Sequence, residues 1–178
     1  MNGGYNMKIS QLKYILFLII PVLFYLQGCS SVTTSNPLIG KTTIESWKSS
    51  KYWNENIYFQ YDPNTQNIEL FKKFYKQDTF KIIIFASIFC DECVANIPQL
   101  AKILEASRFP SESLYLFGLD EYSTEPSGFY KKFKIEHTPE LYLEFSDGKI
   151  ERIIKGQDWL ESINYLLTKR TINKSIEK

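Results

Sequence analysis

The chain is poor in cysteine and histidine: its 178 residues include three cysteines and one histidine. Small secreted proteins held together by disulfides carry several cysteine pairs, so a disulfide-stapled scaffold is excluded. A structural zinc site takes about four ligands, more than one histidine and two closely spaced cysteines supply. Basic and acidic residues are nearly equal in number, 21 and 20, so the charge balance gives no indication of nucleic-acid binding.

The chain also lacks a long hydrophobic run. The longest apolar stretch covers residues 14–26, which is shorter than the about 20 residues that a membrane-spanning helix requires. Lys8 and Lys13 precede this stretch, and Gly28 and Cys29 follow it. A short basic region followed by a short apolar region and a small residue is typical of an export signal.

The tetrapeptide Leu-Gln-Gly-Cys29 that ends this stretch resembles the lipobox of bacterial lipoproteins. In that motif the signal is cut before the cysteine, which carries the lipid. The resemblance implies a signal peptide over residues 1–28 and lipidation of Cys29. It places the protein in the bacterial cell envelope, anchored to a membrane by lipid, with its domain on the extracytoplasmic side. An uncleaved anchor is the alternative, and it too would hold the domain outside the cytoplasm.

Composition predicts the organisation of the remaining chain. Residues 30–40 are rich in Ser, Thr and Asn, which favours a flexible tether. We assign the tether to residues 29–45 and one folded domain to residues 46–178. We find neither an internal repeat nor a second domain.

Cys90 and Cys93 are separated by two residues. They follow the apolar run 82–86, which predicts a strand covered on both faces, and they open a helical pattern that continues to about residue 106. The free amides and the dipole at a helix N-terminus favour thiolate, the attacking species in disulfide exchange. The motif therefore indicates redox chemistry. A static disulfide is the alternative, although its four-residue loop gives only about 2 kcal/mol of stabilisation in the loop-entropy model.

Hydrophobic patterns elsewhere predict an α/β domain. We expect helices over residues 68–75, 94–106, 128–133 and 158–169, and strands over residues 56–61, 81–86, 114–119, 141–145 and 150–154. The Asp147-Gly148 turn joins the last two strands into a hairpin. A parallel strand pair joined by a helix, followed by a hairpin, predicts a central mixed β-sheet flanked by helices.

Residues 78–169 resemble the thioredoxin superfamily in several positions at once. Cys90 and Cys93 follow the apolar strand, Pro98 lies five residues later, and Thr138-Pro139 precedes the next strand. The resemblance implies a thioredoxin-like fold, with Cys90 as the exposed nucleophile and Cys93 as the buried resolving cysteine. It also implies a cis bond between Thr138 and Pro139, and pairing of the Thr138 backbone with an extended substrate segment.

The chain departs from the family beside the cysteines. Phe89 stands where thioredoxins usually carry Trp, and Asp91 and Glu92 replace their Gly-Pro pair. Negative neighbours disfavour thiolate, which weakens the reduced form and predicts a reducing cysteine pair. A second interpretation is that both acids are solvated and merely suit the helix N-terminus.

The residues for proton transfer also differ. Ile84 and Asn96 occupy positions where members of the family carry carboxylates, and Glu144 is the substitute that the sequence offers; its alternative is a solvent-facing strand residue. His137, beside the predicted cis-proline, could titrate near neutral pH and tune Cys90. A histidine on a surface loop is the simpler interpretation.

Together these inferences predict a thiol–disulfide oxidoreductase that acts on cysteine-containing exported proteins, preferably as a reductant. Its redox group would be the Cys90–Cys93 disulfide, with no further cofactor and no metal. It would need an electron donor, a membrane thiol carrier, because no flavin or nicotinamide site can be read from the sequence. A copper-chaperone-like protein and a non-catalytic thioredoxin-fold adaptor are the alternative functions.

Overall fold

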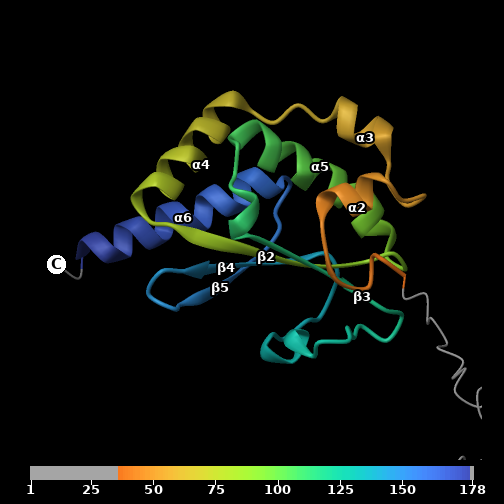
Figure 1. The fold of residues 1–178 in the computed structure, drawn as a ribbon. Coiled ribbons are helices and arrows are strands. Elements are labelled where there is room, and N and C mark those ends of the chain that lie inside the picture. Colours follow the sequence, from red (N-terminus) through yellow and green to blue (C-terminus); the bar gives the residue numbers. More distant parts are fainter. Residues whose placement is uncertain (1–35, 177–178) are drawn as a thin grey trace, which may run out of the picture. The chain divides into compact units, whose positions relative to one another are not determined.

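Five strands form one mixed sheet in the computed structural model, which describes residues 36–176 (Figure 1). The strands are β1 (Gly40–Thr42), β2 (Phe80–Ser87), β3 (Leu114–Leu119), β4 (Glu140–Phe145) and β5 (Ile150–Ile153). Their order in the sheet is β1-β3-β2-β4-β5. β2 and β3 run parallel, and the other neighbouring pairs run antiparallel. The predicted mixed α/β sheet is confirmed.

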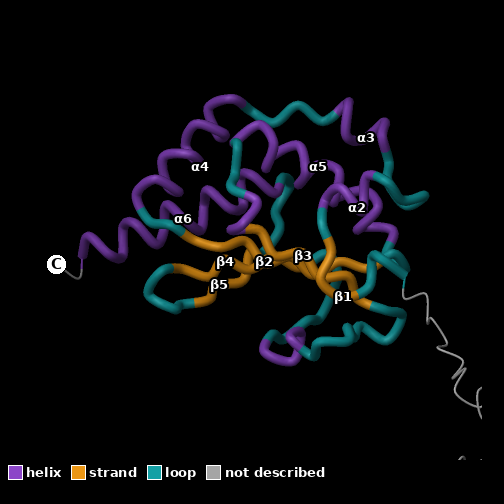
Figure 2. Tube along the Cα trace, in the orientation of Figure 1, coloured by secondary structure: helices purple, strands orange, loops and turns teal. Residues whose placement is uncertain are grey.

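The α-helices lie on one face of this sheet (Figure 1). They are α2 (Ile44–Lys48), α3 (Glu55–Gln60), α4 (Thr65–Gln77), α5 (Asp91–Ser107) and α6 (Trp159–Ile176), with a short 3-10 helix, η1 (Ser111–Ser113), before β3. The other face is covered by the segment between β3 and β4, which contains the 3-10 helix η2 (Phe129–Lys132) (Figure 2). No helix within residues 36–176 is long and apolar enough to cross a membrane.

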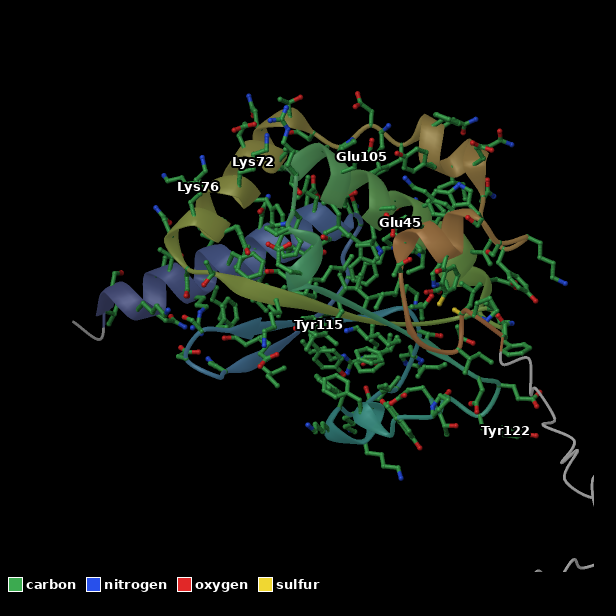
Figure 3. The ribbon with its side chains drawn as sticks, in the orientation of Figure 1. Glu45, Lys72, Lys76, Glu105, Tyr115 and Tyr122 are labelled. Atoms are coloured by element: carbon green, nitrogen blue, oxygen red, sulfur yellow. The ribbon has the colours of Figure 1, made fainter. Side chains whose placement is uncertain are left out.

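The sheet separates two cores because side chains alternate along β2. Ile82 and Ile84 belong to the large core beneath the helices, whereas Ile83 and Phe85 belong to a smaller core on the other face. Phe129 and Phe133 close this smaller core by packing on Phe85. Tyr115 borders it, on the face away from the helices (Figure 3). Burial of β2 on both faces is therefore confirmed.

The predicted strand over residues 56–61 is wrong, because this segment forms helix α3. Its aromatic residues suit a strand, but the Asn54 side chain accepts a hydrogen bond from the Ile57 amide at 3.1 Å and so caps a helix. Tyr58 then packs into the large core and donates a hydrogen bond to Glu105 of α5. The capping residue was the signal that the aromatic pattern concealed.

The predicted tether over residues 29–45 extends too far. Within the described residues, Leu38 is buried, Gly40–Thr42 pairs with β3 as β1, and α2 begins at Ile44. The folded domain therefore begins before residue 46. The predicted signal peptide and Cys29 lie outside the described residues.

Gly118 of β3 allows the backbone of residue 38, just before β1, to approach closely, because it has no β-carbon. A β-carbon built there would lie 1.4 Å from the Leu38 carbonyl oxygen, which is a backbone atom that cannot rotate away. We expect Gly118→Ala to displace residues 38–42 and to lower the free energy of unfolding by about 2 kcal/mol. Urea unfolding measures the change. Gly156→Ala is the control, because its β-carbon would meet only Ser162 at 3.5 Å; equal stability of the two variants would contradict this account.

Arg170 of α6 joins three elements at the end of the sheet. Its side chain is 7% exposed and forms ion pairs with Asp78 at 3.3 Å, Asp147 at 2.5 Å and Glu151 at 3.5 Å. Its guanidinium lies 3.7 Å from the centre of the Phe145 ring. The residue therefore connects α6 to the end of α4 and to the β4–β5 hairpin.

Candidate functional site

The two cysteines lie where β2 passes into α5. β2 ends at Ser87 and α5 begins at Asp91, so Cys90 is the N-cap of the helix. The Cys90 sulfur accepts a hydrogen bond from the Cys93 amide at 3.2 Å. A free helix amide aimed at a sulfur stabilises negative charge on it. The predicted strand-to-helix junction is confirmed, and both thiols are free.

Cys90 and Cys93 occupy different surroundings. Cys90 is half-buried, whereas Cys93 is completely buried. Burial, and then the hydrogen bond with Cys90, raises the pKa of the Cys93 thiol far above its ordinary value, against the opposing contact from the Ser87 amide at 3.3 Å. Cys90 is therefore the accessible sulfur, and Cys93 is held as a protonated thiol behind it.

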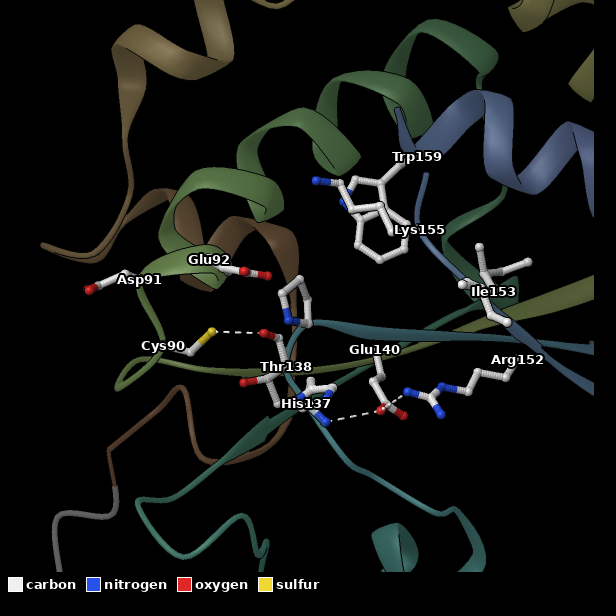
Figure 4. A pocket seen from close by; sticks show the side chains of 12 residues that line it. Cys90, Asp91, Glu92, His137, Thr138, Glu140, Arg152, Ile153, Lys155 and Trp159 are labelled. Atoms are coloured by element: carbon white, nitrogen blue, oxygen red, sulfur yellow. Dashed lines mark hydrogen bonds and ion pairs between the residues drawn. The ribbon is translucent and has the colours of Figure 1, made fainter. Parts of the chain in front are cut away.

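Thr138 and Pro139 meet the cysteines from a distant part of the chain. The Thr138–Pro139 bond is cis, as the resemblance implied. The Cys90 thiol donates a hydrogen bond to the Thr138 carbonyl oxygen, with sulfur and oxygen 2.9 Å apart (Figure 4). The fold thus brings Thr138 beside the cysteine that the resemblance implies as the nucleophile.

A groove of about 640 Å³ opens over Cys90 (Figure 4). Its lining combines the predicted site residues with the start of β4 and the segment after β5: Cys90, Asp91, Glu92, His137, Thr138, Pro139, Glu140, Arg152, Ile153, Ile154, Lys155 and Trp159. Asp91, Glu92 and His137 are exposed at its rim. Phe89 is 60% exposed beside the motif and is not part of the lining. The groove therefore extends from the cysteine turn to the segment that follows β5.

Glu144 does not lie at the site, so the proton-transfer role considered for it is wrong. It pairs with Lys81 at 3.4 Å, opposite the start of β2, whereas the cysteines follow the end of β2. Asn96 is buried and serves as a bridge. Its amide nitrogen donates to the Glu92 carbonyl oxygen at 2.7 Å, and its amide oxygen accepts from the Trp159 indole at 3.0 Å. Asn96 therefore ties the first turn of α5 to the start of α6.

Glu140 is one of the site residues that the sequence analysis missed. It is the first residue of β4, it is 4% exposed, and it lines the groove beside Pro139. A carboxylate at the start of a mostly apolar strand was a signal in the sequence. Its partners come from other segments, so only the fold shows what it binds.

The described residues, 36–176, contain no group of three or more His, Cys, Asp and Glu side chains that could hold a metal ion. In comparisons with known proteins, no protein-family model matches the chain, and no curated protein is significantly similar to it.

Proposed function

We propose that this chain is a thiol–disulfide oxidoreductase with a thioredoxin-like fold. The observation that carries the proposal is the pairing of an accessible helix-capping Cys90 with a buried Cys93, beside the Thr138 carbonyl oxygen. One sulfur can attack, a second can resolve the product, and a backbone segment beside them can bind an extended chain. A static disulfide would not require an open groove over the attacking sulfur.

The proposed reaction transfers two electrons from the protein to a substrate disulfide. The Cys90 thiolate attacks one substrate sulfur, so a mixed disulfide forms and the other substrate sulfur leaves as a thiol after taking up a proton. Cys93 then loses its proton and attacks the Cys90 sulfur. The second substrate thiol leaves, and the protein holds a Cys90–Cys93 disulfide. The raised pKa of Cys93 keeps it from competing with Cys90 in the first step.

We further propose that the protein works as a reductant on exported proteins that contain cysteine. In this direction each turnover leaves the protein oxidised, so a dithiol donor must reduce it; a membrane thiol carrier fits a protein anchored by lipid at Cys29. The exposed Asp91 and Glu92 beside Cys90 disfavour the thiolate and so favour electron donation.

The reduction potential of the Cys90–Cys93 pair tests the proposal. The chain is equilibrated with glutathione or dithiothreitol buffers, and the oxidised fraction is measured by thiol trapping. A potential below about −220 mV supports a reductase. A potential above about −150 mV would indicate an enzyme that introduces disulfides, and absence of exchange would favour the non-catalytic adaptor.

Neutralising the two acids is expected to make the pair more oxidising. A unit charge about 4 Å away contributes about 1 kcal/mol in water, so the double variant Asp91→Asn/Glu92→Gln should raise the potential by roughly 20–40 mV. The same buffer equilibration measures the shift. The double variant Glu55→Gln/Glu112→Gln is the charge-matched control, because both side chains are exposed and neither lines the groove. A fall in potential, or an equal rise in the control, would refute the role of Asp91 and Glu92.

A further inference from the structure

The Glu140 carboxylate is buried in the groove that Cys90 also lines, but it takes no part in the steps proposed above. Burying a carboxylate is costly unless hydrogen bonds satisfy its oxygens. Glu140 is 4% exposed and directly follows Pro139. Its contacts therefore indicate what the buried charge does at this position.

The four hydrogen bonds of Glu140 come from three directions. Oε1 accepts from the backbone amide of Glu136 at 2.9 Å. It also accepts from the His137 amide at 3.1 Å and from the Arg152 guanidinium at 2.7 Å (Figure 4). Oε2 accepts from the Tyr142 hydroxyl at 2.6 Å. Arg152 also pairs with Glu136 at 2.9 Å. The carboxylate thus fastens two neighbouring backbone amides to β4 and β5.

These two amides belong to the residues immediately before Thr138. Glu136 and His137 are exposed, so burial in the core does not fix them. The Glu140 side chain therefore holds the amides of residues 136 and 137, and Pro139 joins the segment 136–138 to the start of β4. The Thr138 carbonyl oxygen at the end of this segment lies 2.9 Å from the Cys90 sulfur, so the position of the segment sets what lies beside the attacking atom.

We infer that Glu140 is a positioning residue for extended substrates: its two amide contacts hold segment 136–138 so that the Thr138 backbone is ready to pair with a substrate chain. The inference rests on the proposed function. A segment held in its binding conformation loses less conformational entropy on binding. A small disulfide reaches Cys90 without pairing with the backbone, so Glu140 selects protein segments over small disulfides.

The test compares two substrates in the full-length chain, solubilised in detergent and supplied with dithiothreitol. One substrate is an unstructured peptide with a single disulfide, and the other is 2-hydroxyethyl disulfide. In Glu140→Ala we expect KM for the peptide to rise about tenfold, as for the loss of one to two hydrogen bonds. We expect kcat for the peptide and the rate with 2-hydroxyethyl disulfide to stay within about twofold.

Two further variants separate positioning from a general structural role. Glu140→Gln keeps an acceptor oxygen for the two amides, so it should restore the peptide KM to within about threefold of the wild type. Glu144→Gln is the matched control, because Glu144 lies on the same strand and pairs with Lys81 away from the groove. If Glu140→Ala fails to fold, Glu140→Asp keeps the charge but shortens the reach to the amides, and the same rise in peptide KM is expected.

The inference is overturned if the variants that fold keep the wild-type peptide KM, lose both substrates equally, or show no rescue by glutamine. In these outcomes the wild type is active, so the proposed function stands. A wild-type protein that reduces neither substrate overturns the proposed function and this inference together.

Discussion

Replacing Cys90 by serine is expected to abolish disulfide exchange, with a loss of at least about a thousandfold. The other thiol of the motif, Cys93, is completely buried, and burial raises its pKa far above the ordinary value, so it cannot substitute as the nucleophile at neutral pH. The loss is measured as the rate at which the peptide disulfide is reduced, monitored through the thiols that are released.

Replacing Cys93 by serine should have a different consequence. Cys90 keeps its access to the groove and its contacts with the Cys93 main-chain amide and the Thr138 carbonyl oxygen. The first attack therefore proceeds, but no second thiol resolves the product, and the mixed disulfide accumulates in a one-to-one complex. Non-reducing mass spectrometry detects the complex. A covalent complex formed by the Cys90→Ser variant instead would reverse the roles assigned to the two cysteines.

Replacing Arg170 by methionine is expected to lower the free energy of unfolding by about 3 kcal/mol, because it leaves three carboxylates without their shared buried cation. The estimate lies at the low end for a broken buried pair, since Asp78, Asp147 and Glu151 are each partly exposed. Methionine retains apolar contact with Phe145. For a domain of this size we expect the melting temperature to fall by roughly 10 °C.

The effect of Arg170→Met should depend on pH. Partial burial opposes ionisation of Asp78, but hydrogen bonds from Lys174, Arg170 and Ser146 outweigh it and lower its pKa. The Lys149 amide and then Arg170 lower the pKa of Asp147. Groups with a lowered folded pKa add stability above their unfolded pKa, near 3.8, and lose it as the pH falls through the folded value. The difference between the wild type and the variant should therefore shrink from pH 6 towards pH 2.

Thermal unfolding across this pH range, followed by circular dichroism, tests the expectation. Lys174→Met is the control, because Lys174 shares Asp78 with Arg170 but its side chain is 45% exposed; we expect it to cost less than about 1 kcal/mol. A variant of Arg170 as stable as this control would show that the ion pairs contribute little.

Sequence patterns were sufficient for the parts of the fold that carry strong periodicity. The apolar run ending before Cys90 and the helix after it are where the pattern placed them, because continuous apolar runs and helical spacing are local properties. β1 was missed because its three residues form a strand only where Gly118 lets the Leu38 backbone approach. α3 was mistaken for a strand because its aromatic side chains obscured the Asn54 cap.

The site residues likewise include some that the sequence could reveal and one that only the fold reveals. Cys90, Cys93, Thr138 and Pro139 could be recognised from spacing and resemblance. Glu140 could not, because its role depends on amides of the preceding loop, on Arg152 from β5 and on Tyr142 of its own strand. Glu144 was considered instead, although the strand register carries it to the far end of the sheet. Register is a tertiary property, and the sequence of β4 alone does not reveal which end faces the cysteines.

The capping of α5 by Cys90 connects the chemical state of the sulfur to the order of the backbone. The sulfur that accepts a hydrogen bond from the Cys93 amide is also the atom that we propose as the nucleophile, and a thiolate accepts a stronger hydrogen bond than a neutral sulfur does. The first turn of α5 is therefore held most firmly when Cys90 is reduced and ionised. It is held less firmly when Cys90 is part of the Cys90–Cys93 disulfide or of a mixed disulfide with a substrate. Hydrogen exchange at the Cys93 amide should consequently report the oxidation state of the protein, without a label and without a substrate.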